Sequence, residues 1–217
     1  MEALFRALLK FLLSFYVPPA MAFLTQIAQA VLPHLAPLTA QRLTVDHLDW
    51  LTTLGYTADI TRVPAEDPVT VMGLRFPNRI GLAAGLDPAG RAVSALGSFG
   101  FGHIEIGTVR PHGFRSTIPH SIRRFHKEEA ITENGHGAGI SFADLQMNLK
   151  SAQAYALRGG VLGLNLSLKE VSPERLIQAA PLADYLTLTA EDLPSDDIAR
   201  RLTLLKKDLS VTVPLVL

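Results

Sequence analysis

The sequence contains no cysteine among its 217 residues. Disulfide frameworks, thiolate metal sites and a cysteine nucleophile or base are therefore excluded, while the redox compartment stays open. An excess of charge of one sign is also lacking, because 20 Lys and Arg residues balance 20 Asp and Glu residues. No global field favours nucleic acid or an acidic substrate as a partner. With 48% hydrophobic residues, the chain is long enough to bury a large core.

A long apolar run free of proline is missing too. Residues 11–41 contain no Asp, Glu, Lys or Arg, but four prolines interrupt them. Proline removes a backbone hydrogen bond and clashes with the preceding helical turn, so we do not expect one continuous membrane-spanning helix. The pattern predicts two short helices instead, over residues 2–16 and 20–32, and a further helix over residues 38–55.

The first two predicted helices have three interpretations. They can lie in the membrane interface, with Arg6 and Lys10 near the lipid headgroups. They can instead pack on the protein's own core, as apolar helices usually do. The third interpretation is a signal peptide cleaved after Ala-Met-Ala at residues 20–22, although the apolar helical pattern continues beyond that point.

From residue 69 onward, short apolar runs alternate with amphipathic segments, which indicates a parallel sheet with covering helices. A tight hairpin centred on Gly73 comes first and can plug the bottom of a βα barrel. We expect strands at residues 79–84, 103–108, 161–166, 185–189 and 211–217. We expect helices at residues 89–98, 141–157, 172–180 and 195–207. The long segment 109–139 is expected to be a functional or mobile loop.

The first strand runs into a turn that can serve a ligand. Residues 79–90 read Arg-Ile-Gly-Leu-Ala-Ala-Gly-Leu-Asp-Pro-Ala-Gly, so an apolar run breaks into small residues at Gly85. Small residues let the backbone approach a ligand, and Asp87 can cap the following helix. Turns of this kind often carry catalytic residues in βα folds.

Three consecutive stretches resemble one known family. Residues 69–78 read Val-Thr-Val-Met-Gly-Leu-Arg-Phe-Pro-Asn, residues 79–90 contain Gly-Leu-Ala-Ala-Gly-Leu-Asp, and residues 99–109 end in Gly-Thr-Val. In this order they resemble the class 2 dihydroorotate dehydrogenases, which are quinone-linked and contain FMN. The resemblance implies an α/β fold, namely part of a (β/α)₈ TIM-type barrel with about five strands and an N-terminal helical extension.

The same resemblance divides the chain into parts. Residues 1–56 correspond to the helical extension that touches the membrane and forms the quinone entrance. Residues 57–78 correspond to a connector and the bottom hairpin, and residues 79–217 to an incomplete barrel. Five strands would leave an unpaired edge and an open apolar interior, which is an aggregation hazard. Phosphate sites of such barrels usually follow strands seven and eight, which are not recognisable in this sequence.

The resemblance also implies cofactor-binding residues. Ala84 and Gly85 lie in the first turn, and Thr108 ends the second strand at the place of a threonine near the flavin. Thr108 can equally be an ordinary β-branched strand residue. Asn165 matches an asparagine that touches FMN, and a lone buried Asn in an apolar strand needs hydrogen-bond partners in any case. Thr189 stands where the family has a flavin-binding asparagine.

Other positions depart from the family pattern. Pro88 replaces a lysine that contacts flavin and substrate, and Asn134 is the candidate for a substrate-binding asparagine. Asp192 stands at the place of the serine base, and a carboxylate can abstract a proton. Alternatively, Glu191, Asp192 and Ser195 simply open the next helix, where acidic side chains favour the helix dipole. The loop histidines match no metal-ligand spacing, so no metal site is predicted.

Taken together, these features predict a flavoprotein of the dihydroorotate dehydrogenase type. It would oxidise dihydroorotate to orotate in pyrimidine biosynthesis and pass electrons through FMN to a quinone. By resemblance it would lie peripherally on the cytoplasmic face of the inner membrane, or on the mitochondrial inner membrane in a eukaryote. The alternative is a catalytically inactive, membrane-associated half-barrel with a scaffold, regulatory or vestigial role. A third possibility is a split barrel that a partner chain completes.

Overall fold

The computed structural model describes residues 30–53, 67–109, 122–125, 127–133, 140–190, 193–208 and 213–216. The first described elements are the 3₁₀ helix η1 (Leu32–His34) and helix α3 (Pro37–Thr53). Proline suits the first position of α3, because that position needs no backbone donor. Helix α3 confirms the helix predicted at residues 38–55. The helix predicted at 2–16 and most of the one at 20–32 lie outside the described residues.

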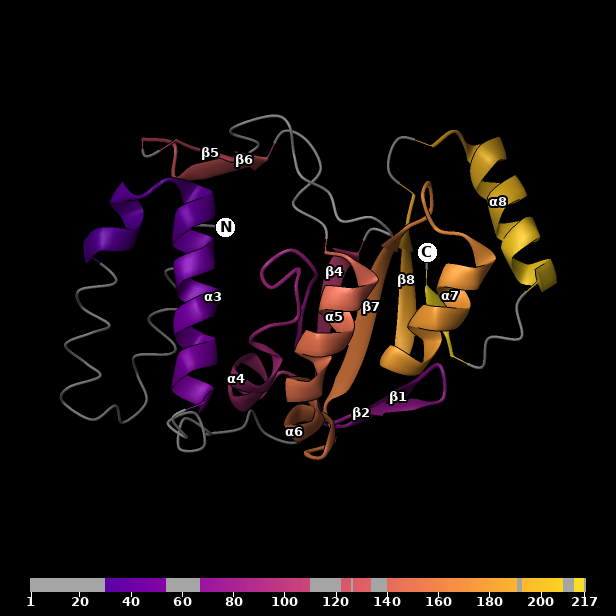
Figure 1. Ribbon diagram of the computed structural model, residues 1–217, viewed down its shortest axis with the longest axis horizontal. Helices are drawn as coiled ribbons and strands as arrows, with labels where there is room; N and C mark the ends of the chain where they lie inside the picture. The colour runs from indigo at the N-terminus through magenta and orange to yellow at the C-terminus, as the bar shows by residue number, and fades with distance from the viewer. Residues whose placement is uncertain are drawn as a thin grey trace.

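Five parallel strands form the central sheet, in the order β3-β4-β7-β8-β9 (Figure 1). Their bounds are β3 (Gly81–Leu82), β4 (His103–Val109), β7 (Val161–Ser167), β8 (Tyr185–Thr189) and β9 (Leu215–Val216). The sheet of the described residues is open, with β3 and β9 at its edges. This architecture confirms the α/β prediction of a partial TIM-type barrel.

Helices follow the strands, as the alternating pattern predicts. They are α4 (Val93–Ser98), α5 (Phe142–Asn148), α6 (Gln153–Ala156), α7 (Pro173–Ala179) and α8 (Ser195–Asp208). The 3₁₀ turn η3 (Leu149–Ala152) separates α5 from α6, so the single helix predicted at residues 141–157 is wrong in its middle. A second 3₁₀ turn, η4 (Ala180–Leu182), ends α7.

The apolar core lies between the sheet and these helices. Alternate strand residues point into it, among them Ile104, Ile106, Leu164, Leu186 and Leu188. Because successive side chains of a strand point to opposite faces, the residues in between occupy the inner face of the sheet. On β4, β7 and β8 that face carries Glu, Asn and Thr side chains, so the expectation of an apolar interior is wrong there.

A β-hairpin closes the amino-terminal end of the inner face, as the sequence predicts. Strands β1 (Val69–Val71) and β2 (Leu74–Phe76) pair antiparallel, and Figure 1 shows them below β7. Met72 and Gly73 have φ values of 55° and 79°, as a two-residue type I′ turn requires. Phe76 packs with Val161 and Tyr185 in a small second cluster, which fills the bottom of the inner face.

A second hairpin occupies part of the segment predicted as a loop. Strands β5 (Ile122–Phe125) and β6 (Ala130–Glu133) pair antiparallel beside the start of α3 (Figure 1). The loop prediction is therefore wrong for these residues. Both strands are only four residues long, and two arginines interrupt the apolar residues of β5. The turn uses Glu129 at a φ of 47°, where a glycine or asparagine would have signalled a hairpin.

Candidate functional site

The site is centred on Asn165, which is 8% exposed on the inner face of β7. Its side-chain oxygen accepts hydrogen bonds from the hydroxyl of Thr108 on β4, at 3.0 Å, and from that of Thr189 on β8, at 2.8 Å. Three adjacent strands thus bring these predicted cofactor residues together near their carboxyl ends. The two hydroxyl donors provide the partners that a buried amide oxygen needs.

Glu105 on β4 binds the other end of the same amide. The Asn165 Nδ2 donates to Glu105 Oε1 at 3.0 Å, and Oε2 accepts from Thr187 at 2.9 Å and Tyr185 at 3.3 Å. An ionised carboxylate only accepts hydrogen bonds, so it holds the NH₂ group of Asn165 on its own side. The amide oxygen then faces Thr108 and Thr189. The carboxylate therefore sets the orientation of Asn165.

Sequence reasoning missed Glu105, Thr187 and Tyr185. A signal was present, because Glu105 lies between two isoleucines and Thr187 between two leucines. Such alternation marks strands with one apolar and one polar face, whereas a parallel strand covered by apolar groups on both sides reads as a continuous apolar run. The polar inner face could have been predicted from this period of two.

A β-bulge in β4 turns Thr108 toward Asn165. Ile106 pairs with Leu164 but Val109 pairs with Leu166, so β4 contains one residue more than β7 over this interval. Strict alternation would have placed Thr108 on the same face as Ile106, in the helix-covered core. The bulge reverses this, with Gly107 at a φ of 125°. Thr108 thereby becomes part of the polar cluster instead of an ordinary core-facing strand residue.

Below Glu105, the polar face meets aromatic side chains. The ring of His103 lies 5.6 Å from that of Phe76 and 6.4 Å from that of Tyr185. Burial lowers the pKa of His103, and the charge of Glu105 partly offsets this. Burial and the Glu105 carboxylate together raise the pKa of Tyr185. Near neutral pH, Tyr185 is thus a protonated donor to Glu105, not a proton-transfer group.

Ala84 and Gly85 lie in the turn that follows β3, beside the carboxyl end of β4. Gly85 has a φ of 111°, and a Cβ atom added to it would meet no atom within 4 Å. The backbone is therefore open there to a ligand that approaches closely. Carboxyl ends of parallel strands share one edge of the sheet, so this turn belongs to the same edge as Thr108 and Thr189.

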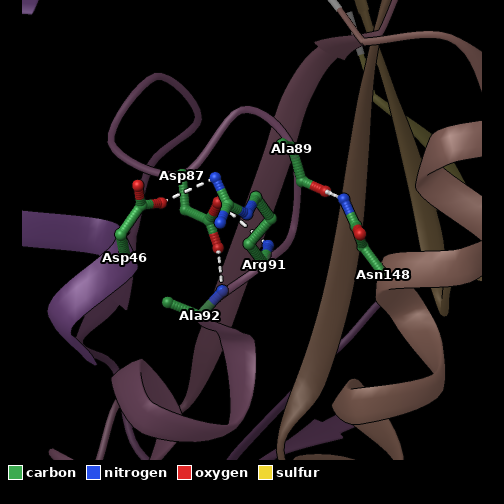
Figure 2. Close-up of polar contacts among 6 residues, drawn as sticks. All are labelled: Asp46, Asp87, Ala89, Arg91, Ala92 and Asn148. Carbon is green, nitrogen blue, oxygen red and sulfur yellow. Dashed lines mark hydrogen bonds and ion pairs between the residues drawn. The ribbon is translucent and has the colours of Figure 1, made fainter. Parts of the chain in front are cut away.

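Asp87 holds the rest of this turn. Its side chain is 4% exposed and accepts hydrogen bonds from the backbone N–H groups of Arg91, at 3.0 Å, and Ala92, at 2.7 Å (Figure 2). Helix α4 begins one residue later, at Val93. Asp87 therefore binds the backbone just before the helix, close to the capping role predicted for this residue. Pro88 lies in the short loop between Asp87 and these two N–H groups.

The other predicted site residues, Asn134 and Asp192, lie outside the described part of the chain. The loop histidines for which no metal site is predicted, His120, His126 and His136, lie outside it as well. Strand β6 ends at Glu133, immediately before Asn134, and β8 ends three residues before Asp192. Among the described residues, no group of three or more His, Asp or Glu side chains could hold a metal ion.

Comparison with known proteins gives several relatives, although no family model matches the chain. A dihydroorotate dehydrogenase (quinone) of Leptothrix cholodnii is 42% identical over 131 residues, which cover 56% of this chain and 38% of that protein. The enzyme of the same name from Herminiimonas arsenicoxydans is 36% identical over 176 residues, covering 76% and 50%. The crystal structure of ligand-free DHODH from Eimeria tenella has a TM-score of 0.62 at 25% identity, covering 77% of this chain and 52% of that one.

The chain thus spans half or less of the length of these curated relatives. Sequence and structure agree on the same family. The structure of this chain contains a parallel sheet whose apolar core is covered by helices. The chain is therefore a homologue of the quinone-linked dihydroorotate dehydrogenases, and its open five-stranded sheet matches part of their TIM-type fold.

Proposed function

We propose that this chain forms one wall of the active site of a dihydroorotate dehydrogenase. The reaction would oxidise dihydroorotate to orotate, for pyrimidine biosynthesis, and pass the electrons through FMN to a quinone. The observation that carries the proposal is the convergence of Thr108, Thr189 and Asn165 near the carboxyl ends of three neighbouring strands. Ligands of parallel α/β folds bind at that edge. Further strands, in the same polypeptide or in a partner chain, would complete the site.

The residues at this edge fit the polar ring of a flavin. The hydroxyls of Thr108 and Thr189 donate to Asn165, so their oxygens keep lone pairs for a ligand N–H group. The open backbone at Gly85, next to Ala84, admits a flat ring. When bound, FMN would supply the acceptor for the hydride of the substrate.

Two further residues are proposed for the substrate. Oxidation of dihydroorotate requires removal of a C5 proton together with hydride transfer. Asp192, just beyond β8, is the proposed base, because a carboxylate at the carboxyl end of a barrel strand can accept that proton. Asn134, which follows β6, is the proposed hydrogen-bonding group for orotate.

The flavin proposal predicts that threonine hydroxyls contribute to FMN affinity. The variant Thr108→Val keeps the β-branched shape and loses the hydroxyl, so the dissociation constant for FMN should rise about fivefold to tenfold, the equivalent of one hydrogen bond. Fluorescence quenching in an FMN titration up to millimolar concentration measures this constant. The matched control is Thr203→Val, which removes an exposed hydroxyl bonded to the Ala199 carbonyl within α8 and should change nothing.

Equal FMN affinities for the Thr108 and Thr203 variants would contradict the proposed flavin site. Circular dichroism on each variant establishes that the sheet is intact. A folded chain with no saturable FMN binding at all would favour the alternative function, an inactive half-barrel.

We also propose that the N-terminal part binds a membrane surface peripherally. None of the helices in the described ranges combines the length and apolar character needed to cross a bilayer. Exposed apolar side chains nevertheless occur on and just before α3, namely Val31, Leu43 and the 52%-exposed Trp50. Tryptophan is amphipathic and favours membrane interfaces. The preceding segment, residues 1–29, carries only three charged side chains, at Glu2, Arg6 and Lys10.

Deletion of residues 1–29 should therefore reduce co-sedimentation with phospholipid vesicles by at least severalfold, since it removes a sequence rich in apolar residues and poor in charge. This deletion keeps Pro33 and Leu35, whose carbonyls bind Arg124. The control is Leu157→Ser, which removes an apolar side chain that is 87% exposed elsewhere in the fold. Unchanged vesicle binding after the deletion would show that the N-terminal segment is not the membrane-binding part.

A further inference from the structure

Helix α3 contacts the turn at the candidate cofactor site directly. We propose that Gln41 of α3 is a positioning residue for the turn that carries Ala84 and Gly85, so that the N-terminal helical part controls the order of this turn. The cofactor role of the turn rests on the proposed function. The contact itself and its effect on the backbone do not depend on that function.

The primary contact is made by one side-chain amide. The Nε2 atom of Gln41 donates to the carbonyl oxygens of Gly85, at 2.6 Å, and Leu86, at 2.9 Å. An amide NH₂ group has two hydrogens, so this arrangement uses both on successive turn carbonyls. Carbonyls in a turn have no strand or helix partner, and the glutamine supplies one across 44 residues of sequence.

A second contact joins the far end of the turn to the same helix. Arg91 forms an ion pair with Asp46 of α3 at 2.6 Å, as Figure 2 shows. Both side chains are nearly half exposed, so this pair alone contributes little. Asp87 connects this ion pair to the turn, because the Asp87 carboxylate accepts hydrogen bonds from the backbone N–H groups of Arg91 and Ala92. The turn is therefore connected to α3 at two places, at Gly85 and Leu86 through Gln41 and at Arg91 through Asp46.

The opposite side of the turn is held by the helix layer that covers the sheet. Asn148 of α5 donates to the Ala89 carbonyl at 2.8 Å (Figure 2). This contact is independent of α3, so after loss of Gln41 the turn would be held by Asn148 and, on the side of α3, only by the weak Arg91–Asp46 ion pair. The expected consequence is local loosening rather than unfolding of the sheet.

Helix α3 is also connected to the segment that precedes the candidate substrate residue. The Arg124 guanidinium of β5 donates to the carbonyls of Pro33 in η1 and of Leu35, just before α3 begins at Pro37. Its partner strand β6 leads directly to Asn134 in the sequence. The segment formed by η1 and α3 thus contacts both the turn of Ala84 and Gly85 and the β5–β6 hairpin.

Hydrogen exchange tests the proposal without any ligand. In Gln41→Ala, the protection factors of the backbone amides of Gly90, Arg91 and Ala92 should fall about tenfold or more, while amides of β7 keep theirs. Those amides bond to Asp87 in the intact turn. The control is Arg42→Ala, a change to the exposed neighbouring residue on the same helix. Unchanged protection of the three amides in Gln41→Ala would overturn the proposal.

Gln41→Glu gives a signature that a mere packing role would not produce. At neutral pH the ionised carboxylate only accepts hydrogen bonds and faces two carbonyl oxygens, so protection should fall at least as far as in the alanine variant. As the pH falls through the carboxyl pKa, ordinarily about 4.3, the protonated group regains one donor and protection should partly return. No such return is expected in Gln41→Ala. Identical pH profiles for the two variants would contradict the donor role of Gln41.

Failure of this proposal is distinguishable from failure of the proposed function. An FMN titration of the same Gln41→Ala variant should show weaker binding, in parallel with the loss of protection. Loss of protection in a chain that binds no FMN would support the link between α3 and the turn and contradict only the flavin site. Full protection together with intact FMN binding would contradict only the positioning role.

Discussion

Purified alone, the 217-residue chain is expected to bind FMN several orders of magnitude more weakly than a full-length relative and to show no dihydroorotate:quinone turnover. Pro88 offers neither charge nor donor where the resembling family has a lysine. The phosphate site of such barrels usually follows strands seven and eight, whereas the described sheet has five strands. Each charge-assisted hydrogen bond contributes roughly 1.5–3 kcal/mol, so three of them correspond to about 10³–10⁶ in affinity.

The rate of quinone reduction in the presence of dihydroorotate and excess FMN measures the turnover, and the Herminiimonas arsenicoxydans relative is the positive control. The variant Pro88→Lys alone should not restore turnover, because the phosphate contacts would still be missing. Turnover by the unmodified chain, abolished in Asp192→Ala, would contradict the expectation and identify Asp192 as the base. Turnover that arises only when a second polypeptide supplies the remaining strands would support a split barrel.

Gly107→Ala is expected to lower the free energy of unfolding by roughly 2–6 kcal/mol, a large share of a typical domain's 5–15 kcal/mol. A Cβ atom there would lie 2.5 Å from the backbone oxygen of Asn165 and 2.9 Å from the backbone nitrogen of Val109. Both are main-chain atoms of paired strands, so neither can move without disturbing the sheet. The φ of 125° adds strain for any residue with a side chain.

Urea unfolding followed by circular dichroism measures the loss. Gly73→Ala is the matched control, because Gly73 also has a positive φ, at 79°, but an added Cβ atom meets nothing within 4 Å. It should cost only about 1–2 kcal/mol. Equal losses for the two variants would mean that the bulge in β4 is not tightly packed against β7.

The regular part of the fold was predictable from local signals. Strand β8 and the start of α8 match the predicted bounds, and β7 extends the predicted strand by one residue. Gly160 precedes β7 and Pro194-Ser195 open α8, while β8 shows the regular alternation of apolar and polar residues that is typical of a strand. The hairpin β5–β6 was missed because its turn residue, Glu129, carries no such signal. The 3₁₀ break at Leu149–Ala152 has no glycine or proline either.

The candidate site was only partly predictable. Asn165 and Thr189 follow from their places in recognisable strands, but Thr108 reaches them through a bulge that no sequence period reveals. The tie from Gln41 to Gly85 joins residues far apart in the chain, and a glutamine on an amphipathic helix looks like any solvated residue. The cofactor roles of Ala84, Gly85, Thr108, Asn165 and Thr189 stay predictions, as do those of Asn134 and Asp192.

The order of the strands bears on how the protein is made. In the sheet, β3, β4, β7, β8 and β9 lie side by side in the order in which the ribosome would release them. Each new strand can therefore pair with an edge that already exists, without displacing an earlier neighbour. Domains tend to fold from the N-terminus during synthesis, and an unpaired edge is the part most prone to wrong pairing. A nascent chain of this protein would need protection mainly at the edge of its most recent strand, until the following βα unit covers it.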